Sequence, residues 1–173
     1  MKKVCAMLCL LLGATLSFAQ STSNVVRWQS MAGVITAPGV DNPVSKNIHS
    51  GTFAWTVRSG SASVDLATGA TQFHVEGLNI NGAMFSGTPG PIKAVTGTLV
   101  CNAGTETEVP LNTGAATLNA QGDTQLTGHI ANIPATCSNP PFLLRIARLQ
   151  GANGLWIATG TQRFTNTGLT TNP

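Results

Sequence analysis

His74 and Glu76 come closest, by type and spacing, to residues that could do chemistry. They stand two positions apart in a segment that alternates polar and apolar residues, so both side chains project from one solvent-facing side of a predicted strand. His49 or His129 from a neighbouring strand would complete a His/His/Glu set of the type that binds zinc. The alternative is a surface pair among Thr and Gln side chains that holds no ligand. The pattern permits a metal site without requiring one.

Hydrolytic chemistry has less support in the residue patterns. No Gly-x-Ser-x-Gly sequence occurs, so a nucleophile elbow is not indicated. Asp65 and Glu76 fall on adjacent strands of a predicted hairpin, but a glycosidase cleft also needs aromatic platforms. Trp28 and Trp55 both fall on predicted core positions and are not free to serve as platforms. The sequence therefore predicts a protein that is not an enzyme and has no cofactor.

An apolar pair, Met84 and Phe85, interrupts a long loop of small residues between positions 80 and 91. An exposed tip would serve as a recognition element, because loops on a rigid β scaffold often carry binding. Alternatively, Phe85 folds back and covers one end of the core, which is the arrangement we favour for a large apolar side chain. In either case this segment is the candidate recognition loop.

The first nineteen residues predict export. Lys2 and Lys3 precede a short apolar run, and Ser17-Phe18-Ala19 offers small residues at the −3 and −1 positions of a signal-peptidase site. Cleavage before Gln20 is therefore predicted. The apolar run is shorter than a membrane span, and no second run of this kind follows it. We expect a secreted or periplasmic protein with no membrane span once residues 1–19 are removed.

Two cysteines, Cys101 and Cys137, remain after the leader is removed with Cys5 and Cys9. In an oxidising compartment they most simply form one disulfide. Their wide separation and the lack of a CxxC motif argue against a redox pair or a thiolate metal site. In the chain-entropy model such a bridge contributes roughly 3–4 kcal/mol. We predict a structural disulfide between them.

The charge balance excludes some partners. Loss of Lys2 and Lys3 lowers the formal net charge from +3 to +1, and the remaining charges are scattered along the chain. A surface that binds nucleic acid needs clustered Lys and Arg, and a membrane-surface segment needs a basic amphipathic helix. Neither pattern occurs here. The sequence thus predicts no nucleic acid and no membrane partner, which leaves an unknown protein or glycan ligand.

The elements that must position these residues are strands. Charged residues make up only 9% of the chain, and period-two alternation recurs along it without any sustained helical periodicity after the leader. Pro110 and the other prolines between positions 38 and 141 fall between the expected strands. The pattern predicts a single-domain antiparallel β-sandwich, immunoglobulin-like or similar, of about 8–10 short strands over residues 20–164, followed by a flexible polar tail over 165–173. The strands are expected at 25–35, 52–58, 61–66, 72–76, 92–101, 115–120, 124–130, 142–149 and 155–162.

Several short segments follow one another in a recognisable order. They are Ala32-Gly33-Val34, Ala37-Pro38-Gly39-Val40, Ser50-Gly51-Thr52, a hairpin over 64–75, Glu76-Gly77-Leu78 and a Gly/Pro loop over 87–91. This order resembles the chordin-type (CHRD) domain of secreted bacterial proteins. The family's Ala-His-Ile-His run is replaced by Asn81-Gly82-Ala83-Met84-Phe85, and Leu144-Arg145-Ile146 stands where the family has Gly-Glu-Ile-Arg. The resemblance implies an immunoglobulin-like sandwich with a binding rather than a catalytic role.

These observations predict an exported, non-catalytic binding or structural module of the bacterial envelope or exterior. The alternative is a metal-binding envelope protein, or a metal-dependent enzyme, that uses His74, Glu76 and another histidine. A third hypothesis is a matrix or adhesion subunit, which would expose edge strands and self-associate.

Overall fold

Ten strands make up the regular structure of the described residues. The computed structural model describes residues 24–37, 40–45, 47–82, 84–148 and 153–162, so the predicted leader and polar tail lie outside it. The strands are β1 (Val25–Gly33), β2 (Ala54–Thr56), β3 (Ser59–Asp65), β4 (Ala70–Glu76), β5 (Asn79–Asn81), β6 (Ala94–Cys101), β7 (Val109–Thr117), β8 (Thr124–His129), β9 (Phe142–Ala147) and β10 (Asn153–Gln162). Within this part of the chain, no helix is both long and apolar enough to cross a membrane.

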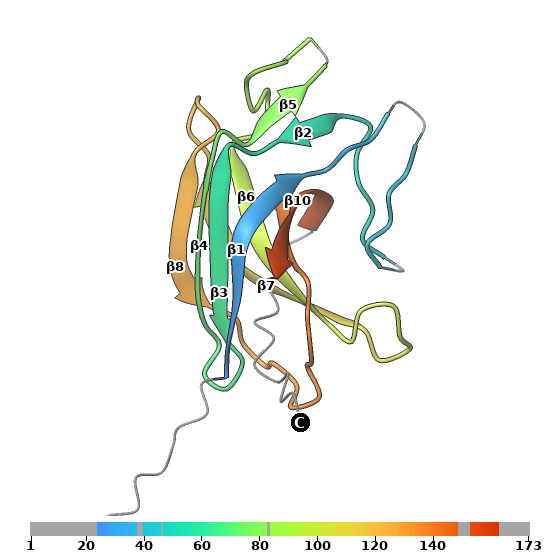
Figure 1. Cartoon of the computed structure of the whole chain (residues 1–173), viewed down its shortest axis with the longest axis vertical. Helices are drawn as coiled ribbons and strands as arrows, with labels where there is room; N and C mark the ends of the chain where they lie inside the picture. The colour runs from blue at the N-terminus through green and yellow to red at the C-terminus, as the bar shows by residue number, and fades with distance from the viewer. Residues whose placement is uncertain (1–23, 38–39, 46, 83, 149–152, 163–173) are drawn as a thin grey trace, which may run out of the picture.

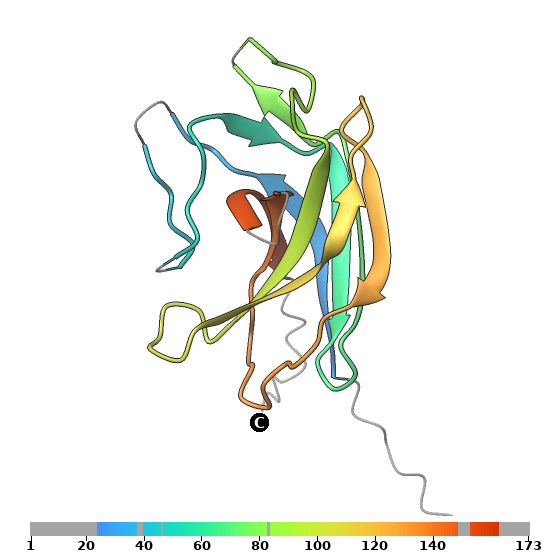
Figure 2. The same ribbon diagram turned by 180° about the vertical axis from the view of Figure 1, so that it is seen from behind.

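Eight of the strands form one antiparallel sheet, in the order β7-β6-β9-β10-β1-β3-β4-β8, and β2 and β5 form a separate two-stranded ribbon. The two ends of the large sheet, β7 and β8, contact each other, so the sheet curls into a nearly closed, barrel-like sandwich (Figure 2). The ribbon of β2 and β5 lies across one end of this barrel (Figure 1). The prediction of a single-domain, all-β antiparallel fold is confirmed.

Three aromatic rings meet inside the curled sheet. The ring of Phe142 on β9 lies 5.3 Å from that of Trp28 on β1 and 5.9 Å from that of Phe73 on β4, measured between centroids. Because β9 and β4 are separated by three other strands in the sheet order, the contact between Phe142 and Phe73 crosses the barrel interior. All three rings are buried. They join the two halves of the sheet.

Two glycines make room for these rings. A Cβ atom at Gly97 on β6 would lie 2.7 Å from Cζ of Phe142, and a Cβ atom at Gly160 on β10 would lie 2.7 Å from Cβ and Cγ of Trp28. Real Cβ contacts are longer than this, so a larger residue at either position would displace a core ring.

A bulge in β1 aims two large side chains at the core. The pairing register of β1 with β10 shifts between Trp28 and Ser30. Trp28 and Met31 are three positions apart, so strict alternation would turn their side chains to opposite faces of the sheet. The bulge inserts one extra residue between them, and both side chains therefore point to the inner face. Both side chains are buried. The polar residues on either side of Trp28, Arg27 and Gln29, remain on the outer face.

Two of the strand predictions were wrong. A strand was expected at 115–120 with Pro110 outside it, but β7 runs from Val109 to Thr117 and pairs Pro110 with Val100. Since β7 is the last strand of the sheet order, the missing N–H of proline costs no bond to a further strand. The strand expected at 52–58 shortens to β2, because it pairs only with the three-residue β5. Phe142, Leu143 and Leu144 at the start of β9 are all buried, so this strand is covered on both faces.

The hairpin of β3 and β4 has the predicted turn. Gly69 adopts a positive φ of 78°, and its N–H donates to the carbonyl of Asp65 over 2.7 Å. The Asp65 carboxylate accepts the N–H groups of Ala67 (2.9 Å) and Thr68 (3.3 Å). These bonds to the charged form lower the pKa of Asp65 from its ordinary value of 3.8, with Ala67 the larger cause. The turn therefore depends on an ionised aspartate.

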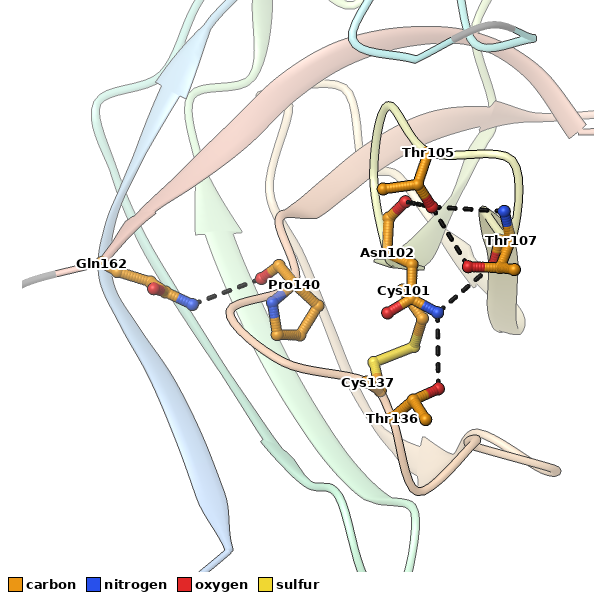
Figure 3. Close-up of a disulfide and its surroundings, with 8 residues drawn as sticks. All are labelled: Cys101, Asn102, Thr105, Thr107, Thr136, Cys137, Pro140 and Gln162. Atoms are coloured by element: carbon orange, nitrogen blue, oxygen red, sulfur yellow. Dashed lines mark hydrogen bonds between the residues drawn. A yellow bond between two sulfur atoms is a disulfide. The ribbon is translucent and has the colours of Figure 1, made fainter.

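The predicted disulfide is confirmed as a close cysteine pair. Cys101 ends β6 and Cys137 lies on the connection from β8 to β9, with Cα atoms 4.8 Å apart. Figure 3 shows the bridge with Asn102, whose side-chain amide donates to Thr107 O (3.3 Å) and Thr136 Oγ1 (3.5 Å). The bridge and these bonds tie the connection from β6 to β7 to the segment that enters β9.

We predict that Gly97→Ala destabilises the protein and that Gly114→Ala does not. A methyl group at Gly97 meets the rings of Phe142 and Phe73, and overpacking of this kind costs about 1–3 kcal/mol. Gly114 on β7 has no atom within 4 Å of the added Cβ, which makes it the matched control. Urea unfolding of both variants measures the difference. Equal stabilities would show that the rings shift without cost.

Asp65→Asn should lose stability at neutral pH, and this loss should shrink in acid. Because the pKa of Asp65 is lowered in the folded state, its carboxylate stabilises the fold above the unfolded value of 3.8, and the contribution disappears as pH falls through the folded value. Urea unfolding of wild type and variant at pH 7, 5 and 3 tests this. A difference that stays constant over this range would exclude a role for the charge.

Candidate functional site

His74 and Glu76 project from the outer face of β4, as predicted, and both are exposed. The register of the sheet places each beside a polar residue. His74 pairs with Ser61 on β3 and Gln125 on β8, and Glu76 pairs with Ser59. Nδ1 of His74 lies 3.2 Å from Oγ of Ser61.

The next cross-strand row along the sheet is equally polar. It contains Arg27 on β1, Ser63 on β3, Gln72 on β4 and Thr127 on β8, each opposite the one before. Neighbouring strands are about 4.8 Å apart and alternate residues about 6.8 Å apart, so two such rows give one continuous polar surface.

Side-chain length turns this surface into a groove. In the middle of β3 the outer face carries the short side chains of Ser61 and Ser63, while longer side chains flank them on β1 and β4. The result is a hollow of about 600 Å³, which we call the β3 groove, with walls and floor formed by Arg27, Gln29, Ser61, Ser63, Gln72 and His74. It extends over β4 to Gln125 and Thr127.

The β3 groove continues into a shallower hollow at each end. One hollow, of about 320 Å³, shares Arg27 and Gln72 with the groove and reaches Asp65. The other, also about 320 Å³, shares His74 with it and reaches Glu76 and Asp123. The three hollows follow one another along the outer face of the sheet, so the feature is a trough open at both ends.

The acidic side chains near the two ends of the trough already have partners. The carboxylate of Asp65 holds the hairpin turn, and Glu76 accepts from Ser59 Oγ (2.9 Å) and from Arg58 (3.3 Å). Asp123 accepts the N–H of Gly77 (2.8 Å), the first cause of its lowered pKa, and an amide N–H of Asn119 is the second. These three carboxylates therefore serve the local structure.

The other two histidines lie away from His74. His129 is opposite Ala70, at the far end of β4, and its Nε2 donates to the carbonyl of Thr68 (2.8 Å). Together with the bond from Ile130 N to Gly69 O (2.9 Å), this holds the hairpin turn against the end of β8. The structure gives His129 a role in docking the turn.

His49 lies on the long connection between β1 and β2, where its Nδ1 is 2.6 Å from Oδ2 of Asp41. Both side chains are about half exposed. Neither His49 nor His129 joins His74 and Glu76. Among the described residues, no three His, Cys, Asp or Glu side chains are close enough together to hold a metal ion.

The polar pairs do not combine into a catalytic triad. Ser61 and His74 form a hydroxyl–imidazole pair, but Glu76 is bonded to Ser59 and Arg58 instead of to His74. His49 and Asp41 form an imidazole–carboxylate pair, but neighbouring Ser50 donates its hydroxyl to the carbonyl of Gly51 (3.2 Å). A triad of the Ser-His-Asp type needs a hydroxyl, a base and an orienting acid that follow one another, and neither pair supplies all three.

A second hollow, apolar and more enclosed, lies at the end of the barrel beside the ribbon of β2 and β5. We call it the end pocket; its volume is about 200 Å³ and its walls include Phe53, Trp55, Ile80, Phe85, Leu155 and Ile157. Trp55, Ile80 and Ile157 are buried and form its base. Phe53 and Phe85 are 44% and 38% exposed, which places two aromatic rings at the boundary between pocket and solvent.

The candidate recognition loop combines the two arrangements predicted for it. Met84 is 86% exposed and projects into solvent, whereas Phe85 turns back and forms a wall of the end pocket. Gly90 permits the close return of the loop, since its Cα carries no side chain and an added Cβ would lie 2.9 Å from Ile80 Cδ1 and 3.2 Å from Phe85 Cβ. Phe85 thus covers the core only in part.

The sequence interpretation missed most residues of both hollows. Arg27, Gln29 and Ser63 stand at outward positions of alternating strands, a pattern that marks any solvent-facing sheet. By the same alternation, Phe53 falls on the same predicted core side of the strand expected at 52–58 as Trp55. The exposure of Phe53 could not be predicted from the sequence, because it depends on how the ribbon of β2 and β5 packs against the end of the barrel.

Comparison of the chain with protein-family models, with curated proteins and with solved structures found no match. The resemblance to the chordin-type domain stays a prediction. The end pocket and the β3 groove are therefore the features from which a function can be inferred.

We expect zinc and EDTA to leave the melting temperature of the protein unchanged. A metal that binds only the folded state raises this temperature, and the three histidines lie at separate places in the fold. Thermal-shift measurements on wild type and His74→Ala, with zinc added up to roughly 1 mM, test this. A rise that His74→Ala abolishes would contradict the expectation and restore the metal hypothesis.

Proposed function

We propose that this protein is an exported, non-catalytic binding module of the bacterial envelope or exterior, and that its end pocket receives an apolar side chain of a protein partner. The observation that carries the proposal is an apolar pocket, more enclosed than the β3 groove, with two half-exposed phenylalanine rings in its wall.

The size of the end pocket selects its occupant. Its volume of about 200 Å³ is smaller than that of pockets for drug-sized ligands. A cavity of roughly 150 Å³ is sufficient for benzene, so the end pocket matches one large aliphatic or aromatic side chain. Among the described residues of its wall, only Thr52 and the indole N–H of Trp55 offer side-chain hydrogen-bonding groups, which are few for a sugar.

The surroundings of the pocket favour a protein partner. Met84 projects from the loop that carries Phe85, and its flexible, polarisable side chain adapts to varied apolar surfaces. Aromatic rings and methionine are enriched at the cores of protein interfaces. A partner that inserted one side chain between Phe53 and Phe85 would also cover Met84.

Export and the absence of catalysis have separate support. The predicted leader at residues 1–19 and the Cys101–Cys137 bridge both fit an oxidising compartment outside the cytoplasm. Among the described residues, the Ser61–His74 and His49–Asp41 pairs are each incomplete as catalytic groups. A binding role requires neither pair.

Toluene, as a probe for an apolar side chain, should bind in the end pocket. Trp55 lines the pocket, whereas the indole N–H of Trp156 is bonded to Asn42 O (2.7 Å) elsewhere. In an ¹H–¹⁵N spectrum, toluene should therefore move the Trp55 indole signal and leave that of Trp156 in place. A spectrum in which neither signal moves at saturating toluene would refute the pocket as a binding site.

Phe85→Ala should weaken toluene binding about fivefold, since removal of one wall of the pocket exposes roughly 40 Å² of apolar surface. Val109→Ala is the control, because Val109 has the same exposure of 38% and lies on β7, outside the pocket wall. An equal loss of affinity in both variants would place the toluene elsewhere.

A further inference from the structure

We propose that the β3 groove is a second binding site, separate from the end pocket, and that it holds an acidic polysaccharide with Arg27 contacting an anionic group of the chain. The groove and the end pocket have no wall residue in common. The proposal therefore goes beyond the function proposed above and does not depend on it.

Arg27 supplies the charge of the site. It is exposed at the wall of the groove, and within the described residues its guanidinium has no hydrogen-bond or ion-pair partner. Among the residues that the structure describes, no carboxylate lines the groove itself. The nearest acids along the trough, Asp65 and Glu76, are engaged by the hairpin turn and by Arg58 and Ser59. An incoming anion would thus meet a guanidinium that no carboxylate of the described residues contacts.

The remaining groups suit hydroxyls. Gln29, Gln72 and Gln125 each offer an amide donor and an amide acceptor, and none has a partner among the described residues. Ser63 and Thr127 add hydroxyls of their own. The rings of Trp28 and Phe73 are buried beneath the floor, so no aromatic face is available for a neutral sugar to stack on. Affinity must then come from hydrogen bonds and from Arg27, which favours an acidic sugar.

The shape favours a polymer over a small anion. The trough continues beyond the groove at both ends, past Asp65 in one direction and past Glu76 in the other. A free anion would occupy only the region around Arg27. The carboxylates of Asp65 and Glu76 at the two ends of the trough favour a polysaccharide whose acidic units alternate with neutral ones. If every unit carried a negative charge, these carboxylates would repel the units that lie beside them.

A peptide partner fits this site less well. The backbone groups of β3 are bonded on one side to β1 and on the other to β4, so the floor offers no free strand edge for β-augmentation. The amides and hydroxyls of the groove project instead as separate side chains, at the spacing of two cross-strand rows.

Isothermal titration with a hexasaccharide of alternating glucuronate and N-acetylglucosamine tests the proposal. We expect this oligosaccharide to bind and its carboxyl-reduced, neutral counterpart to bind at least tenfold more weakly, since a charge-assisted hydrogen bond is lost. Arg27→Gln should lower the affinity for the acidic oligosaccharide about tenfold. Raised salt should lower the affinity of the wild-type protein by a similar factor. Ser63→Phe, which fills the floor without changing charge, should also abolish binding.

Lys93→Gln is the matched control, because it removes an exposed cation that is not part of the groove wall. Equal weakening by Lys93→Gln and Arg27→Gln would overturn the proposal, since it would indicate diffuse attraction to a positive charge. Free glucuronate that binds as tightly as the hexasaccharide would overturn the polymer site in favour of a simple anion site. Tighter binding of an acidic hexapeptide at Arg27 would assign the groove to a protein partner.

Discussion

The contact between Phe142 and Phe73 is the constraint on which the rest of this structure depends. These rings come from strands that three others separate in the sheet, and they meet only because the sheet curls through a nearly closed turn. Trp28 completes the cluster, and Gly97 and Gly160 leave the space that the rings occupy. Aromatic burial of this kind dominates the energetics of a small core. The curl in turn sets where the outer face, the barrel end and the connecting loops lie.

Both proposed sites follow from the curl but use different chemistry. On the outer face, the sheet aligns long polar side chains on β1 and β4 around the short serines of β3, which leaves a polar trough. At the barrel end, the ribbon of β2 and β5 leaves a gap that Phe53 and Phe85 close only in part. One site offers hydrogen bonds and a cation, and the other offers apolar surface. A module with both could hold a polysaccharide and a protein at once.

Several features were predictable because they depend on local chemistry. The β3–β4 hairpin was placed correctly, since Asp65 and Gly69 specify its turn within five residues. The disulfide followed from there being two cysteines outside the predicted leader. The outward direction of His74 and Glu76 followed from alternation. The bounds of β7 were not predictable, because Pro110 is tolerated in this strand only since β7 is the last strand of the sheet order. The exposure of Phe53 was not predictable either, because it depends on how the ribbon of β2 and β5 packs against the barrel.

The sequence by itself determined that this chain forms antiparallel strands, which residues face outward in most of them, and that Cys101 pairs with Cys137. Tertiary structure alone decided which outward residues are neighbours. It separated His129 and His49 from His74, and it brought Arg27 into one row with Ser63 and Gln72. The reason is that a period-two pattern specifies the face of a strand but carries no information on strand order or register, which arise from long-range packing of the core.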